Sequence, residues 1–213
     1  LKLSTLIKPN FTFTKDLVDC NLIADSSLLD LESLISKNIN KYKIITAEKI
    51  KLSILVPENK TTVSKFIISI DSDPDYMGFE NFIDQIQEDK FNEIAQCEFI
   101  INQNNGFDIY ENNSNFDLDF VQIEILNCQY NQGYNFGTFQ ITINRFINYI
   151  NKLDIPYSLS YAKNILNNDK FIWINSFYEE NYEKTLIDNW IYGTNALEIK
   201  DEFIENATCI QSN

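Results

Sequence analysis

The chain has 213 residues, a hydrophobic content of 44%, a formal net charge of −14 and no histidine. That charge argues against general affinity for nucleic acid or for an anionic membrane surface, because both would repel the protein. Without histidine, the chain lacks the commonest general base and transition-metal ligand, and a serine–histidine triad is excluded.

The hydrophobic periodicity predicts six elements in the first half of the chain. Alternating apolar residues indicate strands, and apolar residues at helical spacing indicate helices. In chain order these are a strand at 11–23, a helix at 25–41, strands at 43–56 and 65–71, a helix at 78–96, and a closing strand at 98–103 or 106–111.

The second half shows the same order of patterns. The expected elements are a strand at 119–129, a helix at 138–152, strands at 156–166 and 170–176, a helix at 179–192 with a helical piece to about 206, and a strand at 207–212. Each half therefore reads βαββαβ, which is the ferredoxin-like order.

Short sequence matches indicate an internal repeat behind this order. The segment 17–20 (LVDC) resembles 125–128 (ILNC), and Lys65-Phe66-Ile67 matches Lys170-Phe171-Ile172. The matches keep their order, and their offsets change where loops are expected, since loops tolerate insertions. We predict two ferredoxin-like repeats, 1–108 and 109–213. The alternative is chance matching in a chain rich in isoleucine, asparagine and lysine.

A sheet with helices on one face leaves its other face bare, which would expose a large apolar surface. Packing the two antiparallel sheets face to face would bury both. The sequence thus predicts an α+β fold in which one chain forms a pseudo-dimeric barrel, and we expect a monomer.

The four cysteines, Cys20, Cys97, Cys128 and Cys209, lie far apart and form no CxxC pair. A zinc site and a disulfide framework are not indicated. We expect reduced, partly buried thiols in a cytoplasmic protein. No stretch of eighteen apolar residues is present to cross a membrane. Neither a glycine-rich phosphate loop nor any other cofactor signature is found, so no cofactor is expected.

Residues 171–190, FIWINSFYEENYEKTLIDNW, resemble the FVWLRSF-then-acidic-helix segment of the dimeric α+β barrel superfamily. This superfamily includes NIPSNAP-like proteins and cofactor-independent antibiotic-biosynthesis monooxygenases. The resemblance implies a barrel that holds an electron-rich aromatic substrate, which itself reacts with oxygen. Two departures matter: Asn175 replaces the usual arginine, and haem degradation is in doubt because haem-degrading members use a histidine.

The candidate ligand-binding residues lie on the same strand and the one before it. Phe171, Trp173 and Asn175 share a strand face, because side chains alternate with period two. A largely apolar face with one polar group is typical of ligand pockets. Asn127 and Tyr130 would supply polar groups at the cavity mouth. Alternatively, Trp173 fills the core between the two sheets, Asn175 caps the following turn, and Asn127 binds a neighbouring loop.

Two further features have a structural interpretation. Asp71, Asp73 and Asp75 alternate as at the start of a calcium loop, but the glycine and glutamate that such a loop requires are missing, so a solvated turn is expected. Trp190 occupies an apolar helix position that predicts core packing.

The sequence thus predicts a protein that binds a small hydrophobic or aromatic molecule, and the resemblance extends this to cofactor-independent monooxygenation. The alternative is an acidic, non-enzymatic protein that binds a basic protein partner, as an immunity protein binds a toxin, or that serves as an assembly subunit. The charge of −14 is compatible with the alternative.

Overall fold

The computed structural model describes residues 9–42, 50–57, 63–76, 78–112, 121–164, 166–178 and 194–211. The chain divides into two compact units. The N-terminal unit comprises Thr12–Asn105, and the C-terminal unit comprises Gly106–Asn213 with the segment that ends at Phe11. Strand β4 (Ala95–Asn112) passes from one unit into the other, so each unit uses one part of it.

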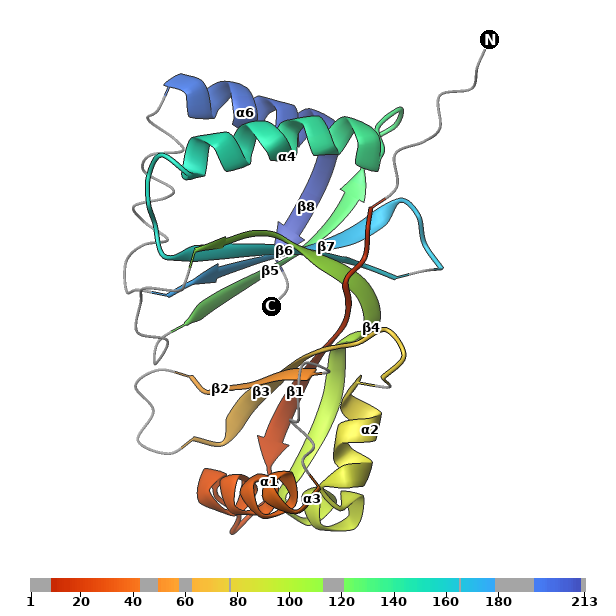
Figure 1. Ribbon diagram of the computed structural model, residues 1–213, viewed down its shortest axis with the longest axis vertical. Coiled ribbons are helices and arrows are strands. Elements are labelled where there is room, and N and C mark those ends of the chain that lie inside the picture. Colours follow the sequence, from red (N-terminus) through yellow and green to blue (C-terminus); the bar gives the residue numbers. More distant parts are fainter. Residues whose placement is uncertain are drawn as a thin grey trace. The chain divides into compact units, whose positions relative to one another are not determined.

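The N-terminal unit is an antiparallel sheet with helices on one face (Figure 1). Its strands are ordered β2-β3-β1-β4. The elements are β1 (Phe13–Leu22), α1 (Leu28–Tyr42), β2 (Ile50–Leu55), β3 (Lys65–Ser72), α2 (Gly78–Gln85), α3 (Glu88–Ile94) and the first part of β4. In β3, Phe66, Ile68 and Ile70 alternate with polar or partly exposed residues, and this pattern places one face of the strand in the core.

The C-terminal unit has the same plan. Its strands are ordered β4-β6-β7-β5-β8, and α4 and α6 cover one face of the sheet (Figure 1). The elements are the end of β4, β5 (Gln122–Tyr130), α4 (Phe136–Ile150), β6 (Tyr157–Lys163), β7 (Lys170–Phe177), α6 (Thr194–Asn206) and β8 (Ala207–Gln211). Helix α4 begins at a capping box, in which Asn135 and Thr138 each accept a hydrogen bond from the other's backbone N–H.

The predicted α+β class with antiparallel strands is confirmed. Two details are wrong. The helix expected at 78–96 is two helices, because Gln87 adopts the left-handed region with φ of 73° and interrupts the helical backbone. The two candidates for a closing strand, 98–103 and 106–111, are parts of the single strand β4. The helix expected at 179–192, with Trp190, lies outside the described residues.

The two units have different cores. The N-terminal core is mostly aliphatic and includes Leu31, Ile68 and Ile70, all fully buried. The C-terminal core is aromatic, and rings from both helices and the central strands contact one another at centroid distances of 4.7–6.5 Å. No helix within the described residues is long and apolar enough to cross a membrane.

The expectation of reduced thiols is wrong. Cys20 is bonded to Cys97, and Cys128 is bonded to Cys209. One disulfide joins β1 to β4 and the other joins β5 to β8, and Cys128 and Cys209 are direct cross-strand partners. The sequence hid this pairing because the bonded residues are 77 and 81 positions apart, and only the sheet order makes them neighbours.

We predict that the variant Cys128→Ser/Cys209→Ser loses about 2–4 kcal/mol of unfolding free energy, since a closed loop of this length restricts the unfolded chain. Guanidinium unfolding without reductant measures this loss. Added reductant should lower the stability of the native chain and leave a variant with all four cysteines replaced unchanged. If thiol titration of the denatured, unreduced protein finds four free thiols, the pairing is wrong.

Candidate functional site

The candidate site lies on the helix-covered face of the C-terminal sheet. Trp173 on β7 is 7% exposed and contacts aromatic rings of both covering helices. Its ring centroid is 5.5 Å from that of Phe139 on α4 and 5.4 Å from that of Phe203 on α6. The expectation that Trp173 packs between two sheets is therefore wrong, because alternation along β7 directs this residue towards the helices.

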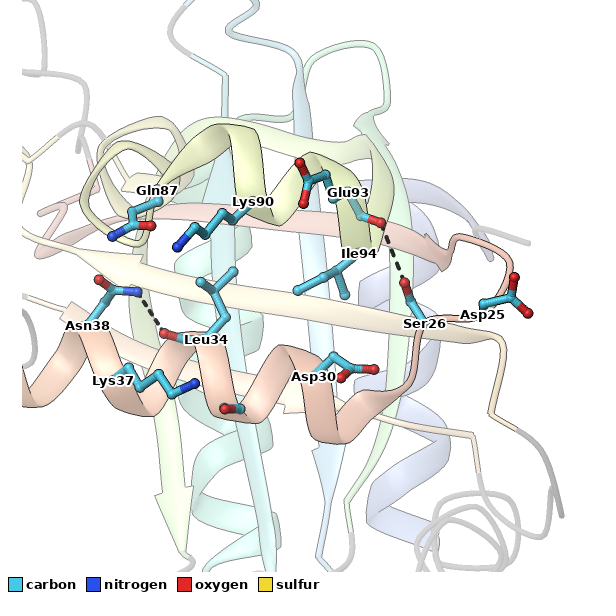
Figure 2. Close-up of a pocket in the computed structure, with 11 residues that line it drawn as sticks. Asp25, Ser26, Asp30, Leu34, Lys37, Asn38, Gln87, Lys90, Glu93 and Ile94 are labelled. Carbon is cyan, nitrogen blue, oxygen red and sulfur yellow. Dashed lines mark hydrogen bonds between the residues drawn. The ribbon is translucent and has the colours of Figure 1, made fainter.

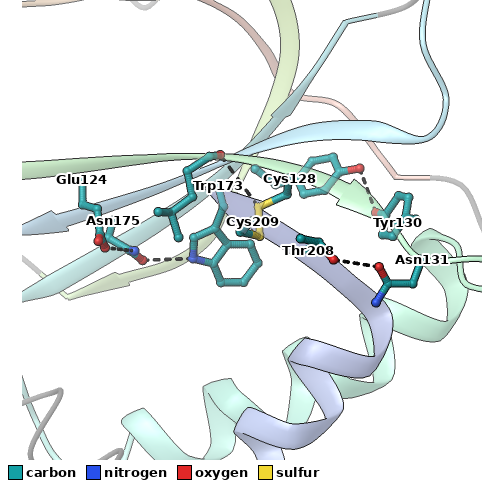
Figure 3. Close-up of a disulfide and its surroundings, with 10 residues drawn as sticks. Glu124, Cys128, Tyr130, Asn131, Trp173, Asn175, Thr208 and Cys209 are labelled. Atoms are coloured by element: carbon teal, nitrogen blue, oxygen red, sulfur yellow. Dashed lines mark hydrogen bonds between the residues drawn. A yellow bond between two sulfur atoms is a disulfide. The ribbon is translucent and has the colours of Figure 1, made fainter. Parts of the chain in front are cut away.

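Asn175 binds three side chains on this face. Its Oδ1 accepts hydrogen bonds from the Tyr157 hydroxyl at 2.5 Å and from Trp173 Nε1 at 3.0 Å. Its Nδ2 donates to Glu124 Oε2 at 2.8 Å. We call Glu124, Tyr157, Trp173 and Asn175 the polar cluster. Figure 3 shows Glu124, Asn175 and the Trp173 indole joined in a row along the sheet.

Strand register brings these residues together. Glu124 on β5 is the direct cross-strand partner of Asn175 on β7. On the other side of β7, Leu159 of β6 pairs with Asn175, and Tyr157 lies two residues away on the same face. Three neighbouring strands therefore contribute polar atoms to one point. Asn175 does not cap the following turn through these contacts, as the alternative interpretation proposed, but holds the side chains of the sheet together.

The polar cluster is largely shielded from water. Asn175 is 8% exposed and Tyr157 is 1% exposed, whereas Glu124 is half-buried. Burial raises the pKa of Tyr157 well above its usual range, and the nearby Glu124 carboxyl raises that pKa further. Tyr157 therefore remains a neutral phenol and donates its proton to Asn175. The half-buried carboxyl group is the member of the cluster that a bound molecule would reach first.

Tyr130 belongs to a second polar pair in the same core. Its hydroxyl lies 3.0 Å from the Tyr161 hydroxyl, and both rings pack against Phe171 with centroid distances of 4.7 and 5.0 Å. Glu124 and Tyr130 are six residues apart on β5, or about 20 Å along a strand. Phe171 and Tyr130 thus share a face with the polar cluster but lie towards the far end of these strands.

Asn127 lies on the opposite face of β5. It is exposed, whereas its neighbour Cys128 is buried in the core. Because alternate residues point to opposite faces, Asn127 is directed away from Trp173 and Asn175. The structure thus brings Trp173 and Asn175 together directly and separates Asn127 from them.

Sequence reasoning missed Glu124 and Tyr157. Both identifications require the register of β5, β6 and β7, which no local pattern gives. A partial signal existed for Glu124, because the repeat register that equates Cys20 with Cys128 also equates Asp16 with Glu124. Asp16 is a buried carboxylate that accepts hydrogen bonds from the backbone N–H groups of Phe79 and Gln103. A strand acid at this position is therefore common to both units.

The N-terminal unit lacks the rest of the cluster. The residues equivalent to Trp173 and Asn175 are Ile68 and Ile70, which are both fully buried. Burial raises the pKa of Asp16, against the lowering effect of its two backbone hydrogen bonds. The described residues contain no group of three or more acidic, cysteine or histidine side chains placed to hold a metal ion.

Two solved structures resemble the whole chain. A protein from Fusobacterium nucleatum, named as a monooxygenase candidate, matches with a TM-score of 0.57 and 12% identity, covering 94% of this chain and 90% of its own. A second monooxygenase candidate, from Lactobacillus acidophilus, matches with a TM-score of 0.52 and 12% identity, covering 93% and 91%. These matches show a shared fold. No family model matches the chain, and no curated protein matches its sequence.

We predict that Asn175→Ala destabilises the protein by about 2–5 kcal/mol, because two buried donors, on Tyr157 and Trp173, lose their acceptor. Tyr157→Phe should cost only about 0.5–1.5 kcal/mol, since it removes a donor and leaves another bonded to Asn175. Urea unfolding of both variants and of the double variant gives the coupling energy. Additive effects would contradict the hydrogen bond.

The tyrosine pair predicts an alkaline loss of stability. Burial raises the pKa of Tyr161 to about 12, whereas an unfolded tyrosine titrates near 10. Between these values the unfolded chain binds fewer protons than the folded chain, so the free energy of unfolding falls as pH rises, by about 2–3 kcal/mol for this residue. Unfolding measured from pH 9 to 12 should show a smaller fall in Tyr161→Phe.

Proposed function

We propose that the protein binds a small aromatic molecule beside the polar cluster of the C-terminal unit and oxidises it with molecular oxygen, without a cofactor. The observation that carries this proposal is the convergence of Glu124, Tyr157 and Trp173 on the amide of Asn175 within an aromatic core. Binding sites for small molecules are mostly apolar, with a few fixed polar groups that orient the ligand.

The residues have distinct roles in this proposal. Glu124 accepts a proton from the substrate, because it is the ionisable and accessible member of the cluster. Asn175 holds the Glu124 carboxylate in position through Nδ2. Tyr157 and Trp173 fix the orientation of Asn175 by donating to its Oδ1. Trp173, Phe139 and Phe203 supply aromatic surface for a planar ligand.

The chemistry balances without an external reductant. An activated methylene carbon of an electron-rich aromatic substrate loses two hydrogens and gains one oxygen atom of O₂ as a carbonyl. The second oxygen atom leaves as water with those two hydrogens. The substrate supplies all the electrons after Glu124 has removed a proton from the methylene carbon, which makes a carbanion that oxygen can oxidise.

We also propose that the chain forms a dimeric α+β barrel. Two ferredoxin-like repeats in the one chain would make this barrel, with their sheets facing each other. Matched strand by strand, the orders β2-β3-β1-β4 and β6-β7-β5-β8 are the same permutation, which supports two copies of one unit. The likeness to two monooxygenase candidates over more than nine-tenths of the chain supports the same conclusion.

Oxygen uptake with anthrone as the probe tests the reaction. We predict turnover to the quinone with one O₂ consumed per anthrone, and a decrease in kcat of at least tenfold in Glu124→Gln, since a positioned base contributes about 10²–10⁴-fold. Glu98→Gln, which makes the same charge change at an exposed residue of β4, should leave kcat unchanged. Equal rates in Glu124→Gln and the native chain would contradict the role of Glu124.

Ligand binding is tested separately from turnover. Trp190→Phe leaves Trp173 as the single tryptophan of the chain, so its fluorescence reports on the cluster. Anthrone under nitrogen should quench this emission in a saturable way. Absence of saturable quenching, together with recovery of a basic protein in stoichiometric amount, would favour the protein-binding alternative.

A further inference from the structure

A groove of about 610 Å³ lies between α1 and α3 in the N-terminal unit. The proposed oxidation site belongs to the C-terminal unit. The wall formed by α1 is a single stripe at helical spacing, made of Asp30, Ser33, Leu34, Lys37 and Asn38. A stripe that faces another helix is normally apolar. Here Leu34 is the one apolar member, so the groove has an unusual polar lining.

The opposite wall comes from α3 and the residue before it. Gln87, Lys90, Glu93 and Ile94 line this side. Figure 2 shows the groove with two chemically different ends. Lys90 lies at the same end as Lys37, Asn38 and Gln87, whereas Glu93 lies with Asp30 at the other. The α1 stripe from Asp30 to Asn38 spans about 12 Å.

Hydrogen bonds hold the groove at both ends. Asn38, buried at 4% exposure, donates through Nδ2 to the carbonyl oxygens of Leu34 at 2.8 Å and Ile86 at 3.3 Å. At the acidic end, Ser26 Oγ donates to the carbonyl oxygen of Glu93 at 3.4 Å. These bonds join the loop before each helix to the other helix. They therefore fix the two walls of the groove relative to each other.

The acidic end is already engaged within the protein. The carboxylate of Asp30 accepts hydrogen bonds from the backbone N–H of Ser27 at 2.8 Å and its hydroxyl at 2.7 Å. These bonds lower the pKa of Asp30, with the hydroxyl bond as the larger cause. Asp30 thus serves as part of the helix N-terminus. The cationic end differs, because neither Lys37 nor Lys90 has an ion-pair partner among the described residues.

The C-terminal unit provides an internal comparison. Its helices α4 and α6 hold the same places in the order of elements, before β6 and β8 respectively. There a cation between the helices is paired: Arg145 on α4 binds Glu198 and Glu202 on α6. One copy of the unit therefore joins its two helices by ion pairs, while the other copy keeps two lysines in an open groove.

We propose that the α1–α3 groove binds a small organic anion, an aliphatic carboxylate, whose carboxylate lies between Lys37 and Lys90 and whose chain lies along Leu34 and Ile94. The ammonium groups of Lys37 and Lys90, which have no ion-pair partner among the described residues, attract an anion that the rest of this acidic chain would repel. The carboxylates at the other end exclude a second negative group, so a single-headed anion fits better than a dicarboxylate.

Octanoate is the probe, followed by amide chemical shifts of the isotope-labelled full-length protein. We expect saturable shifts centred on Leu34, Lys90 and Ile94. The variant Lys37→Glu/Lys90→Glu should bind octanoate at least tenfold more weakly. The matched control is Lys65→Glu/Lys170→Glu, which changes the net charge equally at two exposed residues on other elements and should retain native affinity.

Other outcomes overturn the proposal. It fails if octanoate produces no saturable shifts in the native chain, or if the two double variants bind it equally. It also fails if octylamine binds the groove more tightly than octanoate, because the acidic end would then be the recognition element. Inorganic phosphate binding as tightly as octanoate would show that the apolar wall contributes nothing, and would exclude an aliphatic carboxylate as the preferred ligand. Circular dichroism spectra check that each variant is folded.

Discussion

The amide of Asn175 is the constraint around which the C-terminal core is arranged. It lies among aromatic rings, where an unpaired polar atom would be costly, and it is satisfied by side chains on three adjacent strands. Two of its three partners also need this bond, since Tyr157 and Trp173 are buried donors. The strands must keep a single register for all of these bonds to form.

The two units combine similar elements with different chemistry. Each unit carries a strand acid, Asp16 on β1 or Glu124 on β5, and one disulfide between two of its strands. In the N-terminal unit, Asp16 binds the backbone at the start of α2, and Ile68 and Ile70 occupy core positions of β3. In the C-terminal unit, Glu124 binds the side chain of Asn175 instead. The carboxylate thus binds the backbone in one unit and a side-chain amide in the other, because β7 carries Asn175 where β3 carries Ile70.

The two units also differ in how the cations between their helices are paired. The chain is strongly acidic, yet Lys37 and Lys90 lie at one end of the α1–α3 groove without a carboxylate partner among the described residues (Figure 2). The equivalent helices of the C-terminal unit use Arg145 for ion pairs. Exposed ion pairs contribute little to stability, so the open groove costs the N-terminal unit little. The N-terminal unit thus leaves a groove between α1 and α3, whereas the helices of the C-terminal unit are joined by ion pairs.

Local pattern predicted most of the described helices and strands, the α+β class and the shared strand face of Trp173 and Asn175, because helical spacing and period-two alternation are both readable along the chain. It did not reveal Glu124, Tyr157, the disulfides or the direction of Trp173. Each of these depends on which strands are neighbours and in which register, and on which face the helices cover. Those contacts join residues that are distant in sequence, so only the tertiary structure decided them.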